Sequence, residues 1–162
     1  MPDKSNLALT RGGIMRPDTT RISDVMTAPV VAVTRVTPYK EIAHLLATHQ
    51  ISGLPVVLTD QRVAGVISEA DLVAARDKKA WRARTGTAAG QPWRGGQRRG
   101  AILAGELMTA PAVTIRPDET IATAAVIMTA HRVSRLPVVN QDGTLIGIVS
   151  QGDLLRSITY PE

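Results

Sequence analysis

The apolar residues of this chain fall into short blocks, and each block occurs twice in the same order. A run rich in β-branched residues precedes an amphipathic helical stretch, two apolar runs separated by a polar turn, and a second helical stretch. Short β-branched runs are typical of strands, and apolar residues at every third or fourth position are typical of helices. The pattern therefore predicts a β-α-β-β-α unit, present twice. The apolar runs are 30–33, 54–58 and 63–67 in the first set, and 112–115, 136–139 and 145–149 in the second.

The two sets follow one register at a fixed offset of 82 residues, from Met26–Val73 to Met108–Leu155. Roughly a third of the aligned positions are identical and about a quarter exchange one apolar residue for another, which makes chance a poor explanation. A duplicated unit of this size predicts two similar halves packed together, with paired clefts between them. The recurring segments are Met26–Pro29 with Met108–Pro111, Leu54–Val57 with Leu136–Val139, and Gly65–Asp71 with Gly147–Asp153.

Local signals indicate where the predicted helices and turns lie. The first helix can be capped by Thr37, with Pro38 at its first position, and its counterpart by Asp118 or Thr120. The turn at 140–143 contains Asp-Gly, a strong hairpin signal, whereas the corresponding turn of the first set lacks glycine. The continuously apolar strands indicate that both faces of the sheet are covered.

Composition restricts the class of protein. The chain has 162 residues, enough for one ordinary domain or two small subdomains that share a core. Since Phe is absent and aromatic residues make up 2%, aliphatic side chains and methionine have to form that core. The absence of Cys excludes disulfides and thiolate chemistry. No apolar run approaches the ~20 residues that cross a bilayer, and we find no signal peptide, so we expect a soluble cytoplasmic protein.

The formal net charge of +5 is unevenly distributed. Much of it lies between the two sets, where Trp81 and Trp93 stand among arginines and lysines without periodicity. This connector is either a solvated loop or a nucleic-acid-binding segment whose indole rings stack on bases. We expect five segments: a flexible N-terminal segment at 1–21, a first repeat at 22–76, a basic Gly/Arg/Trp connector at 77–103, a second repeat at 104–158 and a C-terminal tail at 159–162.

Three motifs, in order and twice at equal spacing, resemble the tandem cystathionine-β-synthase (CBS) domain pair, or Bateman module. They are the Met-Thr-x-x-Pro opening, Leu-Pro-Val-Val, and Gly-x-x-Ser-x-x-Asp. The resemblance covers about 22–76 and 104–158. It implies an α/β (α+β) fold of two β-α-β-β-α repeats packed with pseudo-twofold symmetry. It also implies a homodimeric sensor that binds an adenosine derivative in the inter-repeat clefts, with AMP, ADP, ATP and S-adenosylmethionine as candidates.

The same resemblance implies roles for particular residues. The aspartate of Gly-x-x-Ser-x-x-Asp accepts hydrogen bonds from ribose hydroxyls, and the serine faces phosphate. The residues before Leu-Pro line the base or reach phosphate, and the residue two positions after the opening proline contacts adenine through its backbone. The expected ligand-binding residues are Ser150, Asp153, Ser134, Arg135 and Val113 in the second repeat, and Ser68, Asp71, Ser52, Gly53 and Val31 in the first.

Elementary chemistry supports these roles independently. A strand that enters a helix through Ser-x-x-Asp leaves N–H groups at the positive end of the helix dipole, where an anion binds. A carboxylate there can bridge a vicinal diol. The alternative is that each Ser/Asp pair is only a capping box for its own helix. Arg135 in the second repeat, against Gly53 and the acidic Glu69 in the first, favours the second cleft for a phosphorylated ligand.

We expect neither a catalytic nor a metal centre. His44 and His49 are five residues apart, unsuitable for a shared helical metal site, and no Cys or His cluster accompanies them. The sequence contains no Gly-rich phosphate loop, nucleophile elbow or His-Glu-x-x-His. We therefore predict a regulatory CBS-pair protein, not an enzyme, that transmits ligand occupancy to dimerisation or to a partner protein. The rival hypotheses are a nucleic-acid-associated protein that uses the connector and a purely structural dimerisation module.

Overall fold

The computed structural model describes residues 19–77 and 102–159. These residues form two compact units, and each unit combines segments that are distant in the sequence. Unit 1 contains residues 19–28, 114–140 and 146–159, and unit 2 contains residues 29–77, 102–113 and 141–145.

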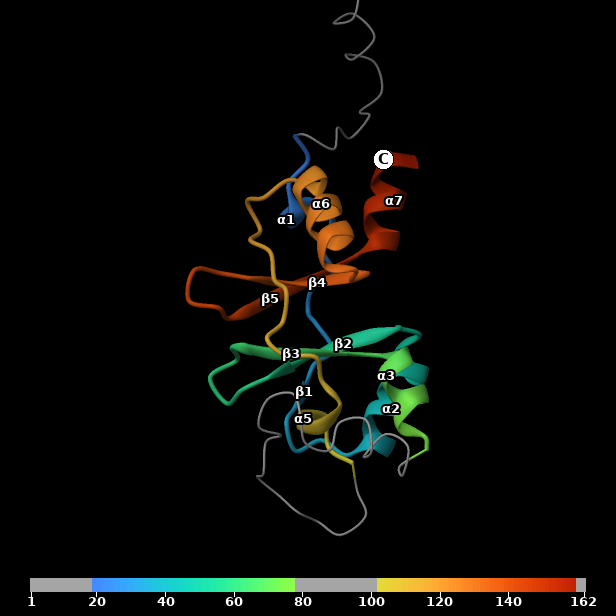
Figure 1. Ribbon diagram of the computed structural model, residues 1–162. Helices are drawn as coiled ribbons and strands as arrows, with labels where there is room; N and C mark the ends of the chain where they lie inside the picture. Colours follow the sequence, from blue (N-terminus) through green and yellow to red (C-terminus); the bar gives the residue numbers. More distant parts are fainter. Residues whose placement is uncertain (1–18, 78–101, 160–162) are drawn as a thin grey trace, which may run out of the picture. The chain divides into compact units, whose positions relative to one another are not determined.

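Unit 2 is built on a three-stranded sheet in the order β1-β2-β3. β1 pairs parallel with β2, and β2 pairs antiparallel with β3, with a register shift between Val56 and Val57. Helices α2, α3 and α5 lie on one side of this sheet (Figure 1). All five residues of β2 are buried, as a continuously apolar strand predicts. The elements are β1 (Val33–Thr34), α2 (Tyr39–His49), β2 (Gly53–Val57), β3 (Val63–Ser68), α3 (Glu69–Ala75) and α5 (Ala104–Leu107).

Unit 1 repeats this arrangement on a two-stranded sheet, β4-β5. Helices α1, α6 and α7 lie together on one side of it (Figure 1). Ile121, Ala124 and Met128 are the buried residues of α6, at the spacing of a helical apolar stripe, whereas Ala125, which the same spacing would add to that face, is exposed. The elements are α1 (Ile22–Val25), α6 (Ile121–His131), β4 (Arg135–Val139), β5 (Leu145–Ser150) and α7 (Gln151–Thr159).

The first predicted strand of each set is shorter than its apolar run. In the first set only Val33–Thr34 pairs with β2, although the run begins at Val30. In the second set the strand is reduced to a single parallel bridge between Ile115 and Val138. The predicted order β-α-β-β-α is otherwise present, but each set is preceded by a four-residue helix, α1 or α5, that the sequence did not predict. The mixed α/β class is confirmed.

The opening segment of each set pairs with the last strand of the other set. Thr109 exchanges backbone hydrogen bonds of 2.9 and 3.1 Å with Val66 inside unit 2. Thr27 exchanges bonds of 2.8 and 3.0 Å with Ile148 inside unit 1. The compact units therefore differ from the sequence repeats, because each unit takes its opening segment from the other repeat.

The helix starts agree with the sequence in one set and differ in the other. Thr120 is the N-cap of α6, as predicted, and its Oγ1 accepts a hydrogen bond from the backbone N–H of Thr123. The prediction that Thr37 caps α2 is wrong, because Pro38 is the N-cap and lies in extended conformation. Thr37 Oγ1 instead accepts from the backbone N–H of Thr34 and stabilises the preceding turn.

Candidate functional site

The Ser-x-x-Asp motif of unit 1 lies where β5 ends and α7 begins. The backbone N–H of Ser150 donates to Asp153 Oδ2 at 2.8 Å, and the backbone N–H of Asp153 donates to Ser150 Oγ at 3.2 Å. These reciprocal bonds form a capping box, the alternative that the sequence left open. The box holds hydroxyl and carboxylate side by side at the start of a nine-residue helix. Such a helix start is suited to an anion.

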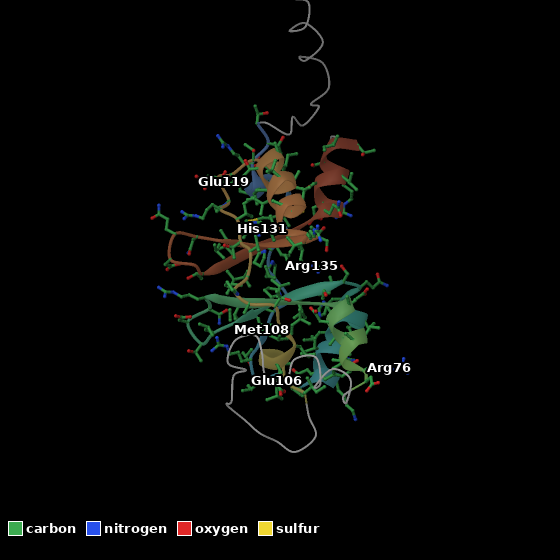
Figure 2. All side chains as sticks on the ribbon, viewed as in Figure 1. Arg76, Glu106, Met108, Glu119, His131 and Arg135 are labelled. Carbon is green, nitrogen blue, oxygen red and sulfur yellow. The ribbon has the colours of Figure 1, made fainter. Side chains whose placement is uncertain are left out.

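The residues before Leu-Pro come next to this motif. The backbone N–H of Gln151, the first residue of α7, donates to the carbonyl of Ser134 at 2.8 Å. Ser134 is exposed, and Arg135, half-buried, is the first residue of β4 (Figure 2). Ser134, Arg135, Ser150 and Asp153 are thus brought together within unit 1 by one strand-to-helix junction.

Unit 2 has the same junction between β3 and α3. The backbone N–H and the Oγ–H of Ser68 donate to Asp71 Oδ2 at 2.8 and 3.0 Å, and the backbone N–H of Asp71 donates to Ser68 Oγ at 3.3 Å. The backbone N–H of Glu69 donates to the carbonyl of Ser52 at 2.9 Å, and Gly53 begins β2. The motif therefore forms the same pair of reciprocal backbone-to-side-chain hydrogen bonds at both junctions.

Val31 and Val113, the two residues expected to contact adenine, differ in whether they share a compact unit with the Ser/Asp pair of their own repeat. Val31 is half-buried against the core of unit 2, the unit that also contains Ser68 and Asp71. Val113 is half-buried at the end of the stretch that belongs to unit 2, whereas Ser150 belongs to unit 1. Only Val31 therefore shares a compact unit with the Ser/Asp pair of its own repeat.

The carboxylate of Asp153 has a further partner that the sequence did not single out. Arg156, one helical turn along α7, forms an ion pair with Asp153 through Nη2 and Oδ1. The Asp153 side chain is 13% exposed, and that of Arg156 is 68% exposed. The signal was present as an acid and a base at i and i+3 in one helix. The spacing alone did not show whether the Arg156 side chain contacts Asp153 or extends into solvent, because that depends on its rotamer.

The two junctions differ in charge. At the offset of 82 residues, Gln151, Arg135 and Arg156 of unit 1 correspond to Glu69, Gly53 and Ala74 of unit 2. The junction of unit 1 thus has two guanidinium groups and one carboxylate. The junction of unit 2 has two carboxylates and no cation at the corresponding positions. An anionic ligand is therefore favoured at the first and a neutral or cationic one at the second.

The structure says less about the basic connector, a metal site and a membrane span. Trp81 and Trp93 of the basic connector lie outside the described residues. Among residues 19–77 and 102–159, no group of three or more His, Cys, Asp or Glu side chains is placed to hold a metal ion. In the same part of the chain, no helix combines the length and apolar character needed to span a bilayer.

Comparison with curated proteins gives relatives of two kinds. Uncharacterized protein MJ1426 of Methanocaldococcus jannaschii is 29% identical over 152 residues, covering 85% of this chain and 90% of that protein. Inosine-5'-monophosphate dehydrogenase of the same organism is 28% identical over 142 residues, which cover 88% of this chain but only 24% of the enzyme. The similarity to that enzyme is thus confined to about a quarter of its length.

Solved structures resemble the chain over most of its length. CBSX2 in complex with AMP has a TM-score of 0.68 at 28% identity, covering 85% of this chain and 95% of that one. The CBS domain pair of protein MJ0100, in complex with 5'-methylthioadenosine and S-adenosyl-L-methionine, has a TM-score of 0.69 at 23% identity, covering 85% and 94%. At that identity the second likeness shows the fold alone.

The family model of the CBS domain matches residues 22–78 and again residues 104–160. These matches contain both Gly-x-x-Ser-x-x-Asp motifs and both junctions described above. The chain therefore belongs to the CBS domain family and contains two copies of the domain.

Proposed function

We propose that this protein is a regulatory sensor that binds an adenine nucleotide at the β5–α7 junction of unit 1. Ser150 and the positive end of α7 receive the phosphate, Asp153 receives the ribose hydroxyls, and Arg135 and Ser134 lie beside them. The corresponding junction of unit 2, with Ser68, Asp71, Ser52, Gly53 and Val31, takes a neutral adenosine-like ligand.

The observation that carries this proposal is the geometry at Ser150 and Asp153. The capping box fixes the side chains of Ser150 and Asp153 at the positive end of α7, so these two side chains are in place before an anion arrives. At the starts of α1 and α5, Asp24 and Glu106 also accept the backbone N–H of the N-cap residue, at 3.2 and 2.8 Å, but no serine stands there. The two Ser/Asp junctions therefore differ from these helix starts in presenting a hydroxyl beside the carboxylate. The AMP bound to CBSX2, a structural relative at 28% identity, supports the choice of ligand class.

The proposed role is regulatory and not catalytic. The enzymes similar to this chain, such as inosine-5'-monophosphate dehydrogenase, match it over only 24% of their length. The protein would need no cofactor, and its adenosine-derived ligand would act as a signal. We keep the cytoplasm as the expected compartment, although one relative at 29% identity, CBSX1 of Arabidopsis thaliana, is chloroplastic.

Thermal unfolding in the presence of AMP, ADP, ATP or S-adenosylmethionine tests the ligand site. A ligand at 100 times its Kd adds about 2.7 kcal/mol, which raises the Tm of a chain of this size by roughly 5–10 °C. Asp153→Asn keeps an acceptor for the N–H of Ser150 but loses the negative charge, so it should remove the shift. Glu106→Gln is the control: the Glu106 carboxylate also accepts the backbone N–H of an N-cap residue, Leu103, at 2.8 Å, and its replacement should leave the thermal shift unchanged. A shift with AMP, ADP or ATP that survives Asp153→Asn, or no shift with any of these three nucleotides, contradicts the site.

We further propose that occupancy is transmitted through an exposed apolar face of unit 1, at which two copies associate. Val126, Leu155 and Ile158 are 69%, 60% and 49% exposed on α6 and α7. Leu155 and Ile158 line a groove of about 220 Å³ between these helices. The lining residues, none of them charged, are Ala125, Met128, Thr129, Val133, Gln151, Leu154, Leu155 and Ile158. A second copy is the occupant that this composition favours, because a twofold contact sets an uncharged face against itself without like-charge repulsion.

The oligomeric state tests this second part. Leu155→Glu places a charge on the face and should shift the mass measured by light scattering from dimer to monomer. Val36→Glu, which changes an apolar residue 58% exposed in unit 2, is the matched control and should leave the dimer intact. A protein that is monomeric before any substitution, or still dimeric after Leu155→Glu, excludes this face as the interface.

A further inference from the structure

Arg156 forms an ion pair with Asp153, whose carboxylate would bind the ribose of the ligand. Its Nη2 is paired with Asp153 Oδ1, while Asp153 Oδ2 accepts the N–H of Ser150. Both oxygens of the carboxylate are therefore engaged in the structure. A ribose diol that binds Asp153 competes with Arg156 for Oδ1, because the bond from Ser150 to Oδ2 belongs to the cap of the helix.

The guanidinium group also lies over the serine side of the junction. A Cβ placed on Gly152 would lie 3.5 Å from Arg156 Nη1 and 3.6 Å from Ser150 Oγ. The space above Gly152 is thus bordered by the arginine on one side and the serine hydroxyl on the other. A phosphate received by Ser150 and the start of α7 would come within reach of Nη1. The side chain is 68% exposed, so it can turn without leaving a buried cavity.

We infer that Arg156 determines the specificity of this junction by exchanging its partner, Asp153, for the phosphate of the ligand. This inference rests on the function proposed above. A nucleoside monophosphate releases Asp153 for its ribose and gives the guanidinium a new anionic partner. A neutral nucleoside also breaks the ion pair between Arg156 and Asp153, but it offers the guanidinium no anionic group in exchange. Arg156 therefore favours phosphorylated ligands over their dephosphorylated forms.

Unit 2 provides the internal contrast. Its equivalent of Arg156 is Ala74, so the carboxylate of Asp71 has no arginine one turn further along the helix. Glu69 adds a second negative charge at the first position of α3. A neutral adenosine-like ligand meets no competing cation there, whereas a phosphate meets two carboxylates. The same motif thus gives opposite preferences at the two junctions.

Calorimetric titration with AMP and with adenosine measures this preference. The titrations use the Asp71→Asn protein, in which the junction of unit 2 is silenced, so that unit 1 is read alone. In that background AMP should bind more tightly than adenosine. Arg156→Ala should lower the preference for AMP by about tenfold, because a charge-assisted bond to phosphate is lost while the competitor of ribose disappears. Affinity for adenosine should rise or stay the same. Arg156→Lys should retain part of the preference, since it keeps the charge but not the planar fork.

Lys40→Ala removes an exposed positive charge on α2 and is the control for net charge, so it should leave the ratio unchanged. A ratio that changes by less than about twofold in Arg156→Ala overturns the inference and leaves the proposed function standing. Equal losses of AMP and adenosine affinity also overturn it, because they would indicate a structural role. If the Asp71→Asn protein binds neither compound, the proposed function fails and the inference with it.

Discussion

Gly65 and Gly147, the first residues of the two Gly-x-x-Ser-x-x-Asp motifs, are the points at which the opening segments come closest to the sheets. A Cβ on Gly147 would lie 2.5 Å from Met26 Sδ and 3.0 Å from its Cγ. A Cβ on Gly65 would lie 2.7 Å from the carbonyl oxygen of Thr109 and 2.8 Å from Met108 Sδ. The shortest distance at each glycine is below the closest approach that a Cβ atom makes to a non-bonded atom, so alanine at either position has to displace a neighbouring group.

The displaced group differs, and so does the expected cost. At Gly147 the obstacle is the flexible end of a methionine, and Gly147→Ala should lower the free energy of unfolding by about 1–2 kcal/mol. At Gly65 the obstacle is a backbone carbonyl that accepts the N–H of Val66 at 3.1 Å. Moving it weakens the pairing of the opening segment, so Gly65→Ala should cost about 3 kcal/mol, the upper end of the range for overpacking.

Double-mutant cycles followed by urea denaturation separate the two cases. Met26→Ala removes the only side chain near Gly147 in that contact, so it should recover most of the cost of Gly147→Ala, with a coupling of about 1 kcal/mol. Met108→Ala should recover little of the cost of Gly65→Ala, because the carbonyl of Thr109 remains. Equal recovery at both glycines, or a neutral Gly147→Ala, would refute the docking of the opening segments described above.

Three smaller predictions use the same denaturation assay. Thr120→Ala removes the N-cap bond to Thr123 and should cost about 1 kcal/mol, whereas Thr37→Ala removes no helix cap and should cost less. Gly143→Ala should cost about 1–2 kcal/mol from backbone strain alone, because φ is +85° and the nearest atom is 3.9 Å away; a neutral result would contradict that turn. Hydrogen bonds from the side chain and backbone of Thr144, with Arg62, hold the pKa of Asp142 below its ordinary value of 3.8. Its stabilising contribution is complete above that pH and is lost as the pH falls through the lowered pKa, so Asp142→Asn should flatten the acid limb of the stability curve.

Much of the fold could be predicted from short-range patterns. The helices at Tyr39–His49 and Ile121–His131 and the strands on either side of each turn follow from apolar spacing. The bonds of Ser150 with Asp153 and of Ser68 with Asp71 also follow, because they join residues only three apart. Glycine at 143 follows from the turn, which requires a positive φ.

The sequence was less informative wherever the same residues had more than one arrangement open to them. The run at 112–115 has strand composition but pairs only through Ile115, because pairing depends on the neighbour available and not on the run itself. Thr37 has the right chemistry for an N-cap, yet its hydroxyl bonds back to Thr34. Arg156 has the right spacing for an ion pair with Asp153, but that spacing leaves the side-chain rotamer open.

By itself, the sequence determined the duplication, the order of helices and strands, and the two capping boxes with their unequal charges, since these depend on composition and on neighbours within one turn. Only the tertiary structure decided that Met26 packs on Gly147 and Met108 on Gly65, so that each compact unit is completed by the other repeat. The physical reason is that a buried glycine in a strand indicates that another segment packs closely there, but the glycine does not specify which segment it is. The partner is chosen by the packing of segments far apart in the chain.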